Sequence, residues 1–390
     1  MPYLLLYICI SILLILSRSI GYKPSNNGTM TPIELTKGWT VFEDGEKTAE
    51  NITMPYLVKD KKAHQIDLFI TLPEIPYEYT ILTAYKDELN LTLLLDNEVL
   101  LESNFSPSKH EKKVNGTSFL HLPLVGNPTG KELHLKLNRT NFPFYTISPE
   151  VSLHDSLDTR ILFLSRNHLG FFLMTTIATL GLLLLIVTLL TSKKKIIYSP
   201  QLYLALFVFV TSLWVLCNTR AIQFFTENTL LIHYLEYISF YSIPTLIWAY
   251  IWLNWHKFGN LSITALTMNL TLFIAVLTLK LVNVSDFISF RSFFHLIILM
   301  NALVLIYVGV KLGLSATKSL RIFFVGFLLF AICCVIDIIR FYLSFSPTTM
   351  TTFFQLGLVL MLICLTLSYA LTINEKIKTQ INASIYKNLA

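Results

Sequence analysis

Seven long apolar runs occupy the second half of the chain and restrict it to one broad class of fold. They lie at about residues 170–191, 201–218, 230–253, 262–280, 290–310, 321–343 and 351–372. Each is close to the length of about 20 residues that an α-helix needs to cross a bilayer. Composition agrees with this interpretation, because 54% of the residues are hydrophobic and only 14% are charged. We therefore predict a seven-helix transmembrane bundle over residues 166–372.

An N-terminal leader and a more polar region precede these runs. The apolar stretch from Leu4 to Leu16 is too short to span a bilayer and is typical of a signal peptide, so residues 1–21 are predicted to be a signal peptide or leader. Residues 22–165 carry frequent Lys, Asp, Glu and Asn and contain no cysteine. A domain built from them must depend on its own hydrophobic core, without disulfides.

Short β-rich segments separated by turn residues fill residues 22–165. QIDLFITLP, YEYTILTAY, LNLTLLLDNEVLLES, TSFLHLPLV and ELHLKL alternate in part between apolar and polar residues, which favours an antiparallel β-sandwich resembling a jelly roll. Asp96 and Asn97 are predicted to form a hairpin turn. GWTVFEDGE resembles the first strand of galactose-binding-like jelly rolls, in which Trp39 and Phe42 would pack inward; the alternative places Trp39 at a sugar-binding surface.

Lysine and arginine predict the orientation of the bundle, because cytoplasmic loops carry an excess of both. If the β-rich domain is extracellular, four of these residues fall toward the outer side: Arg220, Lys280, Arg291 and Arg340. Ten fall toward the inner side: Lys193, Lys194, Lys195, Lys257, Lys311, Lys318, Arg321, Lys376, Lys378 and Lys387. We therefore expect a multi-pass protein of the plasma membrane with its N-terminal domain outside and its C-terminus in the cytoplasm.

Ionisable side chains within the apolar runs concentrate toward the predicted outer side. Charged groups cost free energy in a bilayer, so they face the interior of a bundle and find partners. Three interpretations remain open: static ion pairs between helices, a polar cavity that binds a ligand or relays a signal, and metal or proton chemistry. The residues concerned are Arg220, His233, Glu236, Arg291, His295, Asp337 and Arg340.

Several functional classes lack support in the sequence. No nucleophile elbow, phosphate-binding loop or zinc-protease motif occurs, no Cys/His spacing suggests a metal site, and no cofactor is expected. The soluble region has no arginine-rich stripe typical of nucleic-acid binding. Two functional classes stay open at this point, a small-solute transporter and a glycosylated eukaryotic receptor or trafficking protein. The latter would use the N-x-T sequons at Asn27, Asn51, Asn90, Asn115 and Asn138, although sequons at Asn269 and Asn382 favour chance.

The segment after the last apolar run is predicted to be a cytoplasmic linker helix over residues 373–390. Apolar residues recur there at every fourth position, which gives a helix one apolar stripe. The stripe either pairs with a second copy of the chain in a homodimer or continues the membrane helix at the interface. Its members are Ile373, Ile377, Ile381, Ile385 and Leu389.

Two segments resemble a known family. SLWVLCNTRAIQFF (212–225) and YLEYISFYSIP (234–244) are similar to the second and third spans of bacterial seven-transmembrane receptors with diverse intracellular signalling modules. The resemblance implies an extracellular carbohydrate-binding-like β-sandwich and places Arg220, Glu236 and Tyr237 at recurrent outer polar positions. It also implies a diguanylate cyclase output, because YKNLA (386–390) resembles the opening of a GGDEF domain.

The resemblance implies that every catalytic residue of such a cyclase would lie beyond residue 390. We therefore expect this chain to be the sensor portion and not itself an enzyme. It would transmit an extracellular stimulus to a cytoplasmic output connected with c-di-GMP. The partners implied are membrane lipid, an extracellular ligand such as a carbohydrate, a second copy of the chain and a separate output protein.

Overall fold

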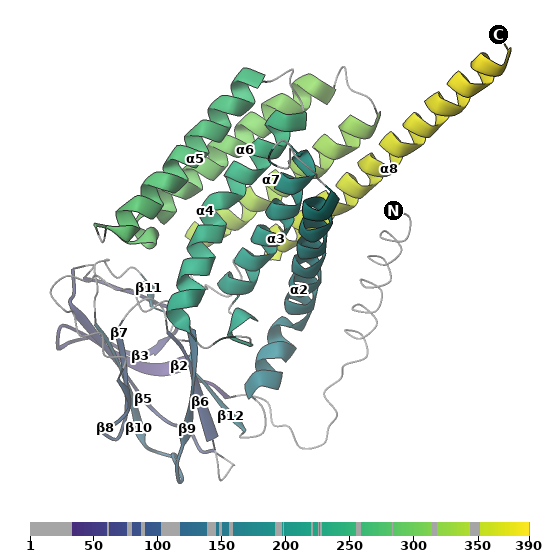
Figure 1. Ribbon diagram of the computed structural model, residues 1–390. Coiled ribbons are helices and arrows are strands. Elements are labelled where there is room, and N and C mark those ends of the chain that lie inside the picture. Colours follow the sequence, from purple (N-terminus) through teal and green to yellow (C-terminus); the bar gives the residue numbers. More distant parts are fainter. Residues whose placement is uncertain are drawn as a thin grey trace.

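The structure is a computed structural model of the whole chain. It describes residues 33–60, 62–75, 80–86, 90–102, 118–138, 146–147, 150–155, 159–191, 197, 199–219, 221–224, 226, 228–254, 259–282, 284–313, 318–343 and 352–389. These ranges contain an N-terminal β-sheet region followed by α-helices (Figure 1).

The strands within the described ranges form two main sheets in which every pairing is antiparallel. A small third sheet joins β11 (Thr146–Ile147) to β4 (Tyr56–Leu57). The four-stranded sheet has the order β1 (Ile33–Glu34), β12 (Ser152–Asp155), β6 (Thr80–Lys86) and β9 (Ser118–Leu124). The six-stranded sheet has the order β3 (Glu46–Thr53), β2 (Lys37–Glu43), β5 (Gln65–Thr71), β10 (Glu132–Asn138), β7 (Asn90–Leu95) and β8 (Glu98–Glu102).

Both main sheets contribute to one hydrophobic core, as expected of a β-sandwich. Leu68 of the larger sheet and Leu82 and Leu153 of the smaller sheet are fully buried in the same cluster. Side chains on a strand alternate between its two faces, and β10 follows this rule with buried leucines at every second position. The core explains how a domain without cysteine holds together.

Trp39 is at the centre of this core rather than at a surface. Its side chain is 0% exposed, and its Nε1 donates a hydrogen bond of 2.7 Å to the carbonyl oxygen of Leu35. Core packing of Trp39 is therefore confirmed, and the alternative of Trp39 at a ligand-binding surface is wrong. The inward packing of Phe42 is also wrong: this residue is half-buried on the opposite face, with its ring 5.4 Å from that of Phe69.

The hairpin turn predicted at Asp96 and Asn97 is confirmed. The two residues join β7 to β8 and have φ angles of 48° and 66°, the left-handed values that a two-residue type I′ turn requires and that Asp and Asn tolerate well. Asp96 also fixes the neighbouring strand, because its Oδ1 accepts a hydrogen bond of 2.8 Å from the amide of Glu132.

A buried carboxylate in the sandwich makes its stability depend on pH. Burial would raise the pKa of Asp67, but hydrogen bonds from His134 and Gln65 outweigh it and lower the pKa. A lowered pKa gives stability that is present above the unfolded pKa and lost as the pH falls through the folded pKa. We expect Asp67→Asn to cost about 1–2 kcal/mol at pH 7, a deficit that shrinks toward pH 3. Thermal melts at both pH values check this; an equal deficit at both would contradict it.

The helical region consists, within the described ranges, of seven α-helices and two short 3-10 helices. The short ones are η2 (Ala221–Phe224) and η4 (Phe287–Phe290). Each apolar run of the sequence lies within one α-helix, and the first helix begins about ten residues before its run. The helices are α2 (Thr159–Thr191), α3 (Pro200–Asn218), α4 (Thr229–Asn254), α5 (Gly259–Leu281), α6 (Arg291–Gly313), α7 (Lys318–Leu343) and α8 (Thr352–Leu389).

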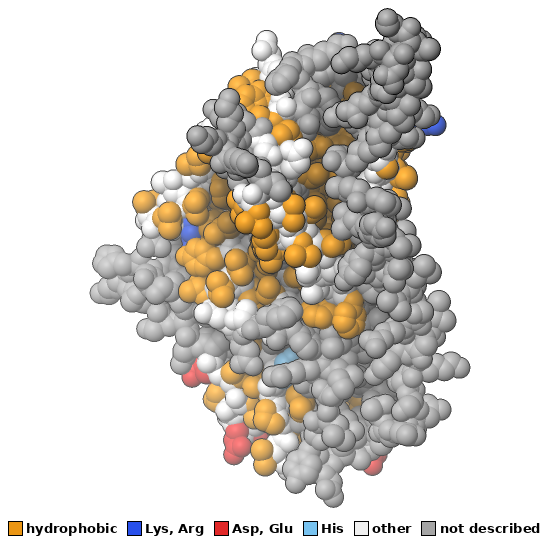
Figure 2. Space-filling view, turned by 45° about the vertical axis from the view of Figure 1, so that its right-hand side comes forward, with side chains coloured by type: hydrophobic (Ala, Val, Ile, Leu, Met, Phe, Trp, Pro, Cys, Tyr) orange, Lys and Arg blue, Asp and Glu red, His pale blue; other side chains and the backbone are white. Residues whose placement is uncertain are grey.

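Five of these helices are long and apolar enough to cross a membrane: α2, α3, α5, α6 and α7. The segment Thr352–Ser368 of α8 is a sixth, shorter apolar helix. On the face seen in Figure 2, hydrophobic side chains cover much of the described bundle surface, whereas the acidic side chains in view lie at the end that holds the β-sandwich. A belt of exposed apolar residues suits contact with lipid, so the structure supports a multi-pass membrane protein.

The β-sandwich and the end of α8 lie at opposite ends of the bundle (Figure 1). The sandwich sits where α2 begins, beside the start of α4 and the turn between α5 and α6, and this end is called the sandwich end below. The last turns of α8 project past the other helices at the far end. This arrangement places a folded domain and a protruding helix on the two sides of one bundle.

Candidate functional site

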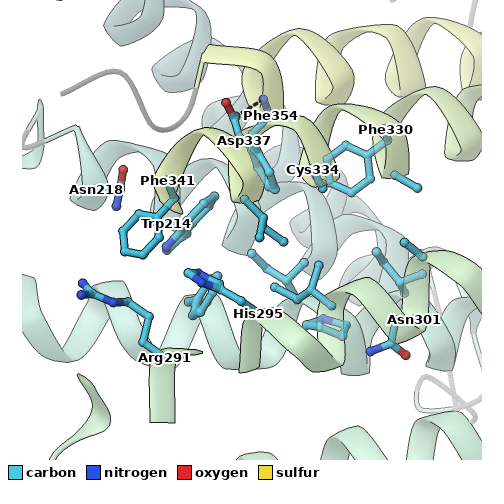
Figure 3. Close-up of a pocket in the computed structure, with 18 of the residues that line it drawn as sticks. Trp214, Asn218, Arg291, His295, Asn301, Phe330, Cys334, Asp337, Phe341 and Phe354 are labelled. Carbon is cyan, nitrogen blue, oxygen red and sulfur yellow. Dashed lines mark hydrogen bonds between the residues drawn. The ribbon is translucent and has the colours of Figure 1, made fainter. Parts of the chain in front are cut away.

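A cavity of about 150 Å³ lies inside the bundle toward its sandwich end. Five helices supply its walls: α3, α4, α6, α7 and α8. Figure 3 shows Arg291 and His295 of α6 entering from one wall and Asp337 of α7 from the opposite one. The cavity is therefore lined by segments that are distant in sequence and meet only in the folded bundle.

Aromatic rings form most of the apolar lining. The indole of Trp214 stacks on Phe240, with 5.3 Å between ring centroids, and meets the edge of Phe354 at 4.6 Å. Phe354 in turn contacts Phe330, at 5.0 Å. Because these residues come from α3, α4, α7 and α8, one aromatic cluster joins four helices around the cavity. Such rings give a ligand a large, stiff apolar surface.

Polar side chains lie among these rings. Glu236 is buried and its Oε1 accepts a hydrogen bond of 3.3 Å from Nδ2 of Asn218, the last residue of α3. The guanidinium of Arg291 lies 5.0 Å from the ring centre of Phe341. Nδ1 of His295 is 3.1 Å from the hydroxyl of Tyr342. Glu236, Arg291 and His295 therefore belong to one lining and have local partners.

Asp337 connects the cavity to the first turn of α8. Its Oδ2 accepts a hydrogen bond of 2.6 Å from the backbone amide of Phe354 (Figure 3), so it satisfies a donor that the helix itself leaves open. Nearby, the guanidinium of Arg340 lies 5.1 Å from the ring centre of Phe353. Two residues of α7 thus hold the beginning of α8, and one of them lines the cavity.

The second oxygen of Asp337 has a different environment. The residue is only 6% exposed, and no described residue forms a hydrogen bond with Oδ1. A buried carboxylate oxygen without a donor costs free energy, about 1–3 kcal/mol or more for a charged group. This oxygen is itself fully buried, so it lies against packed atoms rather than at the open surface of the cavity.

A separate cluster of charged residues lies at the sandwich end. Asp286 accepts a hydrogen bond of 2.5 Å from Nζ of Lys280, and its Oδ1 is 3.0 Å from Nε2 of His233. All three side chains are at most 6% exposed. Burial would raise the pKa of Asp286, but His233 and Lys280 outweigh it and hold the pKa below its usual value. The cluster ties α4 and α5 to the segment before α6.

A third polar group joins helices halfway along the bundle. Asn269 and Asn301 exchange hydrogen bonds of 3.0 and 3.1 Å through their side-chain amides, and Nε1 of Trp248 donates to Oδ1 of Asn301 at 2.7 Å. Asn301 and Trp248 also line the inner end of the cavity. Asn269 is 0% exposed, so its sequon is enclosed in the bundle.

The residues singled out from the sequence lie in different parts of the structure. His233 belongs to the Asp286 cluster, Arg340 contacts Phe353 beside the cavity, and Arg220 lies outside the described residues. The side chains of the tail stripe, at 373, 377, 381, 385 and 389, also lie outside the described part, although the backbone there is helical. The residues that the structure brings together in the cavity lining are Glu236, Tyr237, Arg291, His295 and Asp337.

Sequence reasoning missed several members of the lining. Asn218 lies in the segment 212–225, but its side-chain amide is neutral, so the cost of burying charge did not single it out. Asn301 and Trp248 lie in apolar runs and carry no charge, so nothing but their side-chain amide and indole N–H distinguishes them from the apolar residues around them. His233 and Glu236 lie three residues apart on α4, but their side chains contact different partners, Asp286 and Asn218 respectively. Among the described residues, no group of three or more His, Cys, Asp or Glu side chains is placed to hold a metal.

Comparison with known proteins does not assign a family or a function to this chain. No family model matches the chain, and no curated protein matches it. The cavity, the contact of Asp337 with α8 and the division into a β-sandwich and a bundle of membrane helices are therefore the observations from which a function must be argued.

Proposed function

We propose that this chain is a membrane receptor module that carries a stimulus from the cavity or the β-sandwich to the protruding end of α8. In this proposal all seven helices cross the membrane, the jelly-roll-like sandwich is extracellular and the end of α8 is cytoplasmic. The resemblance of residues 212–225 and 234–244 to bacterial seven-helix sensors supports the same assignment, with a cyclase-type output as the intended recipient.

The contact between Asp337 and Phe354 is the observation that carries this proposal. Asp337 belongs to the lining of the cavity, and its Oδ2 holds the start of α8. A change in the cavity that draws Asp337 away alters the first turn of α8. Because α8 is a single helix from Thr352 to Leu389, the change reaches the protruding end without crossing a loop.

The helices α7 and α8 are joined closely enough to move as one unit. Gly326 of α7 packs against Cys364 and Met361 of α8, and Gly357 of α8 packs against Cys333 of α7. At the far end, the hydroxyl of Ser319 donates a hydrogen bond of 2.6 Å to the carbonyl oxygen of Ser368. The pair is thus fixed at both ends and in the middle, which suits rigid-body displacement against the other helices.

The protruding end of α8 is proposed to meet a second copy of the chain or a separate output protein. The four-residue spacing of Ile373, Ile377 and Ile381 supports this, because a stripe on one helix face is what a coiled partner requires. Such pairing would let a displacement of α7 and α8 change the distance between two outputs.

A distance measurement on the full chain tests the relay. Spin labels at Asn260→Cys, at the far end of α5, and at Ile381→Cys are introduced after the native cysteines are replaced by alanine. Asp337→Ala, which removes the cap, should shift or broaden the distance distribution measured by pulsed electron resonance.

Tyr241→Phe is the matched control for this measurement. It removes the hydrogen bond from the hydroxyl of Tyr241 to the carbonyl oxygen of Phe287, which costs about 1 kcal/mol without touching α8. Its distribution should equal that of the parent protein. A distribution for Asp337→Ala that also equals the parent would refute the relay.

A further inference from the structure

We infer that the cavity binds one small uncharged molecule, an aromatic ring that carries at most a hydroxyl group and other small substituents. The inference rests on the proposed receptor function in treating the cavity as a place where a stimulus enters, and it specifies the class of ligand. The apolar lining, the volume and the balance of charge around the cavity each point to this class.

The lining and the volume of the cavity suit one ring. Around Phe354, the ring of Trp214 lies at 4.6 Å and that of Phe330 at 5.0 Å, measured between centroids (Figure 3). The cavity has a volume of about 150 Å³, and an apolar cavity of about 150 Å³ is known to hold one benzene ring. Aliphatic side chains of α4, α6 and α7 extend the apolar surface, among them Ile243, Ile247, Ile298, Ala302 and Ala331.

The charges of the described residues around the cavity cancel. Glu236 and Asp337 bring two negative charges to the lining and Arg291 brings one positive charge. The guanidinium of Arg340, one turn along α7, adds a second positive charge and attracts the carboxylate of Asp337. An imidazole such as that of His295 is mostly uncharged near pH 7. A charged ligand would therefore add a charge that nothing here balances, in surroundings where charge is costly. A zwitterion would bring two ionised groups out of water.

The polar groups of the lining already have partners, so they do not require an ionic ligand. Glu236 accepts a hydrogen bond from Nδ2 of Asn218, and Asp337 accepts one from the amide of Phe354. An uncharged ligand leaves these bonds in place and gains free energy by removing its apolar surface from water. A hydroxyl on the ring is also acceptable, because a carboxylate can accept several hydrogen bonds.

Phe354 connects occupation of the cavity to the start of α8. This residue lines the cavity, and its amide donates to Oδ2 of Asp337. A ligand packed against Phe354 would fix the spacing between the first turn of α8 and the residues of α4 and α6 in the same lining. A ligand favours the arrangement to which it binds more tightly, so occupation of the cavity would bias the position of α8.

Quenching of tryptophan fluorescence tests the inference on the purified full chain in lipid nanodiscs. Trp214 and Trp248 line the cavity, and bromine quenches the emission of an indole that it contacts. 4-Bromobenzyl alcohol should quench part of the emission saturably, with half-saturation at about 1 mM because ligands of this size bind weakly. Partition into lipid adds only a linear component. 4-Bromobenzylamine, 4-bromobenzoate and 4-bromophenylglycine have the same ring and bromine but carry a positive charge, a negative charge and both charges. They should give no saturable component.

Filling the cavity locates the binding. Ala302→Leu adds carbon atoms to the lining from α6 and should weaken saturable quenching at least about tenfold, while the linear component remains. Leu303→Phe adds as many carbon atoms at the next position, where the side chain is 66% exposed and outside the lining, and should bind like the parent. Ala331→Leu repeats the test from α7 if Ala302→Leu does not fold.

The ligand class is overturned if 4-bromobenzyl alcohol gives no saturable quenching, if any charged analogue quenches as much, or if the filled variants bind normally. Quenching reports binding without any measurement on α8, whereas the relay measured by spin labels needs no ligand. Failure of the ligand class and failure of the proposed relay are therefore distinguishable.

Discussion

Replacing Asp286 with alanine should lower the free energy of unfolding by about 3–5 kcal/mol, because it removes the carboxylate between two buried partners. Lys280 would keep a charged ammonium in a site where its side chain is 6% exposed. His233, at 1% exposure, would lose its acceptor as well. The loss is large because the enclosed site leaves little room for water to replace the carboxylate.

Thermal or SDS-induced unfolding in detergent, followed by tryptophan fluorescence, measures this effect. Glu98→Ala is the control, since it removes an exposed carboxylate on β8 and should change stability by less than about 0.5 kcal/mol. A double variant with Asp286→Leu and Lys280→Met should recover much of the loss, because it removes both charges together. A cost below about 1 kcal/mol for Asp286→Ala would show that the cluster does not hold these segments together.

Gly326→Ala should destabilise the bundle by about 3 kcal/mol, at the upper end of the usual cost of overpacking. A Cβ at this position would lie 2.5 Å from the Cβ of Cys364 and 3.3 Å from backbone atoms of Met361. Two carbon atoms make contact at about 3.5–4.0 Å, so α7 and α8 would have to move apart. Alanine's better helix propensity, worth about 1 kcal/mol, offsets only part of this.

Gly309 supplies the matched control for Gly326. It also lies in a membrane helix, but an added Cβ would meet Phe324 at an ordinary 3.5 Å, so Gly309→Ala should be neutral or slightly stabilising. Combining Gly326→Ala with Cys364→Gly should restore part of the lost stability, because it removes the clashing atom. Equal melting temperatures for Gly326→Ala and Gly309→Ala would contradict the close packing of α7 and α8.

The elements of this fold were predictable because their signals are local. The apolar runs match the helices α2–α8 closely, since length and hydropathy are properties of a continuous segment. Period-two alternation similarly identified β5, β7 and β10. The error at Phe42 came from neglecting the same rule: Trp39 and Phe42 are an odd number of residues apart, so on one strand they must face opposite sides.

The site was predictable only in outline. The cost of charge in a bilayer made it certain that Glu236, His295 and Asp337 would turn inward. It did not determine their partners, because these depend on how each helix is rotated about its own axis. The pairing of Lys280 with Asp286 and the capping of α8 by Asp337 join residues on different elements, and no spacing rule within one segment reveals them.

Because α8 is one unbroken helix, a small tilt at its beginning would become a larger displacement at its end. A helix of 38 residues is about 57 Å long at about 1.5 Å per residue. When such a rod pivots at one end, each degree of tilt moves the other end by about 1 Å. In the proposed relay, a tilt of a few degrees at the Asp337 contact would therefore move the protruding end of α8 by several ångström.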